Sequence, residues 1–249
     1  MNEAGPQPAA WHYEPAQDLD QTLTERLRHF PREPDMLVYG LRVLGSLVVR
    51  AWLRAYHRLE INGREHLPVG SSFVLLANHS SHLDALCLLA ALPLKKLHRA
   101  FPAAAADYFF QSVPRIWMAA VVVNALPFGR QVQIRQSLGL CEGLLSNPGN
   151  VLILFPEGTR SATGQLNTFK PGIGLLLAGR SVPVLPCYLA GAFRAWRKGC
   201  IVPRPAKVRL TIGAPRNYAA LTPGKASACA IAAELQQAVQ QLKDEHEIL

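Results

Sequence analysis

Acidic residues are scarce in this 249-residue sequence. Only 17 Asp and Glu oppose 26 Lys and Arg, which gives a formal net charge of +9. Residues 161–233 contain no acid but ten Lys and Arg. Such a stretch favours a surface that meets anions, although solvated basic side chains without a partner give the same pattern. Charged residues make up only 17% of the chain, which indicates anionic lipid or a phosphorylated substrate as readily as nucleic acid.

Several motifs are also absent. The five cysteines are scattered without a C-x-x-C pair, so neither a zinc knuckle nor a disulfide framework is indicated, and a reducing compartment is the simpler interpretation. No G-x-S-x-G occurs, which argues against a serine nucleophile on an elbow. Residues 1–34 lack an apolar core and are not expected to be a signal peptide.

The N-terminal part divides into two predicted segments, a polar leader over 1–35 and an amphipathic helical segment over 36–60. The helix carries Arg42, Ser46, Arg50 and Arg54 at four-residue spacing. A membrane-spanning helix would bury an arginine at a cost of at least ~2.5–3.5 kcal/mol, so a helix in the membrane interface fits better. An ordinary amphipathic helix packed on the domain is the alternative. Its arginines, with Arg58, are expected to meet the membrane surface, as are four cations further along the chain, Arg194, Arg197, Lys198 and Arg204.

The remaining chain, 61–249, alternates between strand and helix patterns, which predicts a single α/β domain with a mainly parallel sheet flanked by helices. Strands are expected over 71–78, near 99, and over 121–127, 151–155, 182–189 and 208–212. Helices are expected over 19–29, 85–92, 113–120, 132–145, 171–178 and 225–243.

A first polar cluster, NHSSHLD, follows the strand predicted at 71–78. Ligands bind at the carboxyl ends of strands in open α/β sheets, so chemistry is expected here. His79 and Asp84 would lie about 140° apart on a continuous helix. They can meet if His79 lies in a turn and Ser80 or Ser81 caps the following helix. The carboxylate would then fix the imidazole tautomer and leave the other nitrogen as a base. A structural His–Asp hydrogen bond is the alternative, and His82 is a competing histidine.

A second cluster, PEGTRS, follows the strand predicted at 151–155. Arg160 could pair with a phosphate and Glu157 could accept hydrogen bonds from hydroxyls, with Thr159 between them. Gly158 would allow close backbone approach or a positive φ. Two further cations, Lys170 at the next helix start and Arg130 after the strand at 121–127, could add charge to an anion site.

These blocks resemble the glycerolipid acyltransferase family over about residues 71–213. NHSSHLD resembles the family's H-x4-D block, and NALPFGR, PEGTRS and VPVLP resemble the next three in order. The resemblance implies acyl transfer from acyl-CoA or acyl carrier protein to a lysophospholipid hydroxyl, with 1-acyl-sn-glycerol-3-phosphate as the leading acceptor. His79 would be the general base and Asp84 its orienting partner. No metal or bound cofactor is implied.

The resemblance also assigns the acceptor site. It implies that Glu157, Gly158, Thr159 and Arg160 shape this site, and that Arg160, Arg130 and Lys170 hold the phosphate. The expected partners are the thioester, the lysophospholipid and an anionic membrane surface, with no nucleic acid. The expected location is the cytoplasmic face of a membrane, with the protein peripheral or monotopic.

One position departs from the family pattern. Gly129 stands where the family commonly has an acid before Arg130. Another lysophospholipid or polar-lipid acceptor is therefore an alternative with the same chemistry, and a non-catalytic basic protein that binds lipid or nucleic acid is an alternative of another class.

Overall fold

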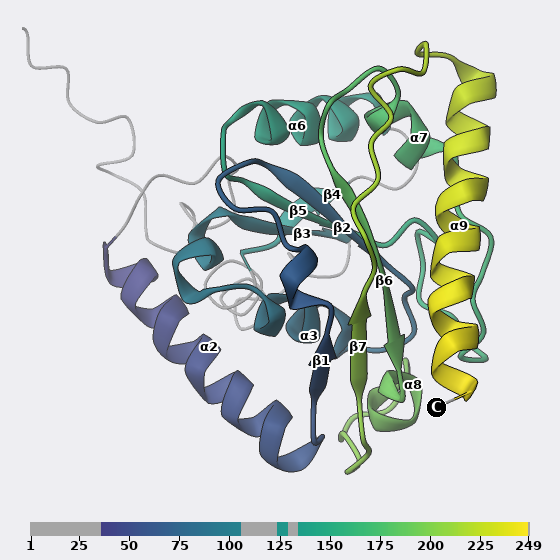
Figure 1. The fold of residues 1–249 in the computed structure, drawn as a ribbon. Coiled ribbons are helices and arrows are strands. Elements are labelled where there is room, and N and C mark those ends of the chain that lie inside the picture. The colour runs from purple at the N-terminus through teal and green to yellow at the C-terminus, as the bar shows by residue number, and fades with distance from the viewer. Residues whose placement is uncertain (1–35, 106–123, 129–133, 249) are drawn as a thin grey trace, which may run out of the picture.

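The computed structural model describes residues 36–105, 124–128 and 134–248. Within them lies a seven-stranded sheet of order β1-β7-β6-β2-β5-β3-β4 (Figure 1). β6 and β7 pair antiparallel and the other pairs are parallel. The strands are β1 Glu60–Asn62, β2 Phe73–Ala77, β3 Ala100–Ala105, β4 Leu126–Phe128, β5 Val151–Leu154, β6 Val184–Ala190 and β7 Arg209–Ile212. The predicted α/β class with a mainly parallel sheet is confirmed.

Helices cover both faces of this sheet (Figure 1). One face carries α2 (Met36–Tyr56), α3 (Asp84–Ala91) and the 3-10 turn η2 (Leu94–Arg99), while the other carries α6 (Ile134–Ser146), α7 (Gly172–Leu177) and α9 (Lys225–Ile248). The short η1 (Arg64–His66) follows β1, and α8 (Ala192–Trp196) follows β6. Successive side chains of β2 point to opposite faces of the sheet. Leu75 therefore joins the core beneath α3, and Leu76 joins the core beneath α7 and α9.

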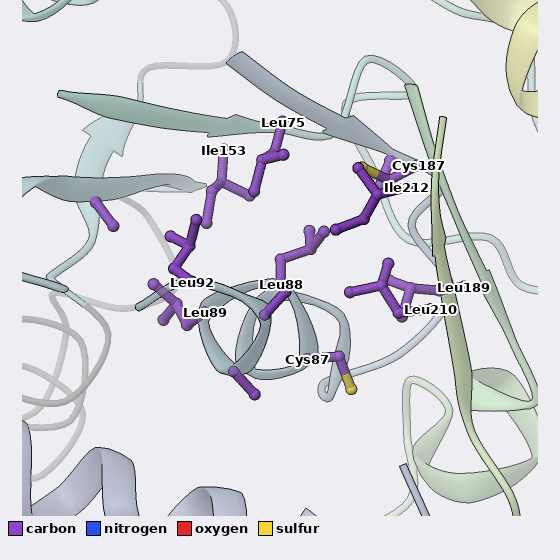
Figure 2. Close-up of a cluster of buried hydrophobic side chains, with 14 of the residues drawn as sticks. Leu75, Cys87, Leu88, Leu89, Leu92, Ile153, Cys187, Leu189, Leu210 and Ile212 are labelled. Carbon is purple, nitrogen blue, oxygen red and sulfur yellow. The ribbon is translucent and has the colours of Figure 1, made fainter. Parts of the chain in front are cut away.

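The core beneath α3 holds the start of that helix in place. Figure 2 shows Leu88 of α3 pointing toward the sheet, where Leu75, Ile153 and Ile212 come from three different strands. All four side chains are at most 1% exposed. Full burial of such a side chain contributes about 1.5–3 kcal/mol, so α3 is firmly placed on the sheet. Since Asp84 is the first residue of α3, its position is set by this packing.

Helix α2 packs on the domain with Arg42, Ser46 and Arg50 of its polar stripe inward. Arg42 is 3% exposed, and Arg50 Nη2 donates to the carbonyls of Leu89, at 3.1 Å, and Leu92, at 2.6 Å. The last carbonyls of a helix have no partner within the helix, so Arg50 satisfies the C-terminal end of α3. Exposed apolar side chains occupy much of the remaining surface of α2: Met36, Leu37, Leu41, Leu44, Leu47 and Val48.

The expectation that Arg42 and Arg50 meet the membrane surface is therefore wrong, because both side chains face protein. Arg54 and Arg58 are exposed, as expected. By length and apolar composition, α2 is the one helix among the described residues that could cross a membrane.

Other expected elements agree within a few residues where the structure describes them. The described part of the strand expected over 121–127 contains β4, while the helices expected over 19–29 and 113–120 lie outside the described residues, as does the leader over 1–35. β1 and α8 were not expected. β1 has a single apolar residue, Ile61, and exists because it pairs with β7, which is remote in sequence.

Candidate active site

The H-x4-D block forms a tight turn between β2 and α3. Nδ1 of His79 lies 2.8 Å from Oδ2 of Asp84, so the expected pairing is present. The same oxygen accepts the backbone N–H groups of Ser80, at 2.7 Å, and Ser81, at 2.8 Å. Asp84 is fully buried, so its carboxylate replaces water as the partner of three donors. This carboxylate organises the whole turn as well as the imidazole.

The serines act differently from the expectation. Neither caps α3, whose N-cap is Leu83 without a side-chain hydrogen bond. Ser81 Oγ instead accepts from the backbone N–H of Leu83, at 3.1 Å, and donates to the carbonyl of Trp196, at 2.8 Å. Hydroxyls bond readily to backbone two residues ahead in such turns. Ser81 thereby joins the turn to α8.

The pairing with Asp84 determines which imidazole nitrogen can act. An ionised carboxylate only accepts hydrogen bonds, so Nδ1 of His79 carries the proton and Nε2 presents a lone pair. The ring stacks on Phe155, with centroids 4.1 Å apart and planes inclined by 17°. Phe155 therefore supports one face of the ring. The side chain is still 23% exposed, so the imidazole remains accessible. This arrangement suits a general base.

Glu157 attaches the loop after β5 to the H-x4-D turn. Its Oε1 accepts the backbone N–H of His79, at 2.7 Å, and its Oε2 accepts the side-chain amide of Asn167, at 2.8 Å. The residue is 4% exposed. Burial raises the pKa of this carboxyl, and the hydrogen bonds from His79 and Asn167 oppose the rise. The backbone N–H of Ser161 also donates to the carbonyl of His79, at 2.7 Å. Both backbone polar groups of His79 are thus held by the second polar cluster.

Arg160 reaches back to the first block. Its Nη1 lies 2.6 Å from Nδ1 and 2.7 Å from Nε2 of His82. Burial, followed by the nearby Arg160, lowers the pKa of His82 to about 4, so the ring is neutral at pH 7 and can accept from the guanidinium. His82 was the competing candidate for the partner of Asp84. In the structure it contacts Arg160, the residue predicted to hold the phosphate, and His79 is the histidine that pairs with Asp84.

Gly158 and Lys170 lie against each other. Gly158 has φ +75°, which side chains disfavour. A Cβ atom there would lie 2.7 Å from Nζ of Lys170, so the bare backbone lets the lysine cross the loop. Lys170 and Thr159 are exposed. The predicted residues of the second cluster therefore lie together near His79, whereas Arg130 lies outside the described residues.

Sequence reasoning missed Asn167, Phe155 and Trp196. Asn167 supplies donors to Glu157, Phe155 supports the imidazole, and the Trp196 carbonyl accepts from the H-x4-D turn. Their only sequence signal was proximity to a motif or strand end. Among the described residues, no three His, Cys, Asp or Glu side chains gather into a set that could hold a metal ion.

Comparison with known proteins places this geometry in a family. The sequence profile of the Acyltransferase family matches residues 58–190. The chain is 28% identical to a 1-acyl-sn-glycerol-3-phosphate acyltransferase of Limnanthes alba over 72% of this chain and 60% of that protein. It is 26% identical to the alpha form from Mus musculus over 61% of this chain and 52% of that protein. The alignments thus span 60% or less of the length of these relatives.

A solved structure shares the fold. The crystal structure of the 1-acyl-sn-glycerophosphate (LPA) acyltransferase from Thermotoga maritima superposes with a TM-score of 0.61 at 24% identity, over 83% of this chain and 80% of that one. The family profile spans both polar clusters and covers more than half of the chain. The chain belongs to the Acyltransferase family.

Proposed function

We propose that this protein transfers a fatty acyl group from a thioester, acyl-CoA or acyl carrier protein, to the free hydroxyl of 1-acyl-sn-glycerol-3-phosphate, giving phosphatidic acid. The observation that carries the proposal is the hydrogen bond between His79 and Asp84, held in place by Glu157. The activity for which these relatives are named supports the acceptor. The catalytic unit would be 61–249, with 36–60 at the membrane.

The reaction needs one general base and no nucleophile from the protein. Nε2 of His79 takes the proton of the acceptor hydroxyl while its oxygen attacks the thioester carbonyl carbon. The tetrahedral intermediate then expels the thiolate, which receives the proton from the imidazolium. Asp84 stabilises that imidazolium through Nδ1. The thioester is already activated, so neither a metal nor a cofactor is required, and a backbone N–H would stabilise the oxyanion.

His79→Ala tests this chemistry. Loss of a general base costs about 100- to 10,000-fold in rate. We expect that loss in thiol release from acyl-CoA with lysophosphatidate, with the fold retained. His66→Ala is a matched control, because His66 bonds the carbonyl of Ile212 beyond the opposite edge of the sheet. Full activity of His79→Ala would refute the assignment.

The phosphate of the acceptor is assigned to Arg160 and Lys170, with Arg130 as a further cation. Arg160 is the strongest candidate, because a guanidinium donates paired hydrogen bonds to phosphate. Hydrogen bonds to charged groups contribute about 1.5–3 kcal/mol, so Arg160→Ala should raise the KM for lysophosphatidate by about tenfold to 100-fold. An acceptor without phosphate, such as monoacylglycerol, should be unaffected. Equal weakening of both acceptors would contradict the phosphate role and favour another polar-lipid acceptor.

Association with a membrane is proposed through α2. Arg42, Ser46 and Arg50 of its polar stripe face the domain, while its apolar face, with Leu41, Leu44, Leu47 and Val48, remains exposed. An apolar helix face with the remaining arginines at one end suits the headgroup layer, with the protein peripheral or monotopic on the cytoplasmic face. Leu44→Asp together with Leu47→Asp should therefore weaken pelleting with vesicles, and unchanged pelleting would contradict this role.

A further inference from the structure

A second apolar surface lies on the loop that follows α8, residues 197–207. Ile201 is 92% exposed and Val202 is 69% exposed, so two large aliphatic side chains stand side by side in solvent. The loop also carries Arg197, Lys198, Arg204 and Lys207, and it contains no acid. This pairing of an apolar tip with flanking cations is unlike the single exposed aliphatic residues that normal protein surfaces carry.

The loop is held by hydrogen bonds across its base. The backbone N–H of Arg204 donates to the carbonyl of Ala195, at 2.8 Å, which closes the loop. The indole N–H of Trp196 donates to the carbonyl of Cys200, at 2.9 Å, and the N–H of Cys200 donates to the carbonyl of Arg197, at 3.2 Å. Ile201 and Val202 therefore lie on a loop whose base is fixed by hydrogen bonds.

That base connects the catalytic turn to α2. The carbonyl of Trp196 accepts from Ser81 Oγ, at 2.8 Å, and from the backbone N–H of His82, at 3.1 Å. On the other side, the hydroxyl of Tyr56, the last residue of α2, donates to the carbonyl of Pro203, at 3.2 Å. The loop thus lies between the end of the apolar helix and the H-x4-D turn (Figure 1).

We propose that the 197–207 loop inserts Ile201 and Val202 into an anionic lipid bilayer and thereby places the active-site turn at the membrane surface. The inference rests on the proposed function, because a lysophospholipid acceptor lies in that bilayer. The occupant is a lipid surface because the loop joins an apolar tip to cations: the aliphatic side chains leave water among the acyl chains while the basic side chains remain at the headgroups. Each basic residue near an anionic leaflet strengthens binding by about fivefold.

Vesicle pelleting tests the insertion. The double variant Ile201→Asp, Val202→Asp is compared with the wild-type chain on phosphatidylcholine vesicles that contain phosphatidylglycerol. Val69→Asp is the matched control, since Val69 is 96% exposed and precedes β2, at the sheet edge opposite the active site. We expect the double variant to bind at least about tenfold more weakly and the control to bind normally. Wild-type binding by the double variant, or an equal loss in Val69→Asp, would overturn the proposal.

Charge is tested separately with Lys198→Gln and Arg204→Gln. Each should weaken binding about fivefold on the anionic vesicles and have no effect on pure phosphatidylcholine vesicles. The backbone bond of Arg204 to Ala195 is retained in this variant, so the loop stays closed. Equal losses on both kinds of vesicle would overturn the electrostatic part.

Activity separates this proposal from the proposed function. The double variant should lose turnover of vesicle-borne lysophosphatidate in proportion to its binding, and should keep wild-type turnover of a short-chain lysophosphatidate dissolved as monomers. If the wild-type chain acylates no acceptor, the proposed function fails, while vesicle pelleting still tests whether the loop inserts into the bilayer. If the double variant turns a wild-type dimer into a monomer and pelleting is unchanged, the tip serves a second copy of this chain and the bilayer proposal is overturned.

Discussion

Helices α2 and α9 are the two longest described helices and they treat their apolar residues in opposite ways. α9 buries Ile231, Leu235 and Val239 against the sheet, as a helix in water should. α2 buries Arg42 and Ser46 and exposes Leu44 and other large apolar side chains. The two helices lie on opposite faces of the same sheet (Figure 1). The burial pattern of α9 is therefore that of a helix packed in a water-soluble domain, while the outward apolar face of α2 fits the membrane contact proposed for it.

The sharpest test compares one leucine from each helix. Leu235 is fully buried and Leu44 is 60% exposed. Leu235→Ala should lower the free energy of unfolding by about 2–5 kcal/mol, because it removes buried methyl groups and leaves a cavity. Leu44→Ala should change it by less than about 0.5 kcal/mol. Urea denaturation of both variants measures the difference, and similar losses would show that α2 packs as α9 does.

A second test concerns the polar contacts that hold α2 inward. Arg50→Met keeps an unbranched apolar stem but leaves the carbonyls of Leu89 and Leu92 without this donor. We expect a loss of about 1–3 kcal/mol in unfolding free energy. Arg54→Met is the matched control, because Arg54 is exposed on the same helix and should matter by less than about 0.5 kcal/mol. Equal effects would mean that the inward arginine does not anchor the helix.

The smallest effect is a pH dependence at the end of α2. His57 is buried edge-on against the rings of Trp52 and Tyr56, and burial lowers its pKa below the ordinary value of 6.5. The unfolded chain therefore binds a proton first, so stability falls as the pH drops below about 6.5. His57→Leu should flatten the decline in melting temperature between pH 7 and 5. Parallel curves for variant and wild type would exclude this role.

The sequence predicted the strand and helix order well because buried strands and helix ends leave local marks. The run SSFVLLAN predicted β2, and Pro93 correctly marked the end of α3. β1 was not predicted because three residues with one apolar side chain show no hydrophobic periodicity. Only their pairing with β7 makes them a strand. The pairing of His79 with Asp84 could be predicted because five residues of turn leave few alternatives.

Contacts made across long sequence separations could not be predicted. Nothing local to Glu157 indicates that its oxygens receive the backbone of His79 and the amide of Asn167. The sequence interpretation made it a partner of substrate hydroxyls, whereas in the structure its carboxylate already accepts from protein donors on both oxygens. The contact of His82 with Arg160 also spans 78 residues, and it depends on the parallel pairing of β2 with β5.

By itself, the sequence determined the α/β class, the H-x4-D and PEGTRS clusters at strand ends and the basic surplus of the second half, since each depends on local order and composition. Only the tertiary structure decided which way α2 faces. The arginines of α2 could equally have met lipid headgroups or protein, and the carbonyls of Leu89 and Leu92 at the end of α3 hold Arg50 inward by accepting its hydrogen bonds. That contact, between segments 39 and 42 residues apart, leaves the apolar side of α2 exposed.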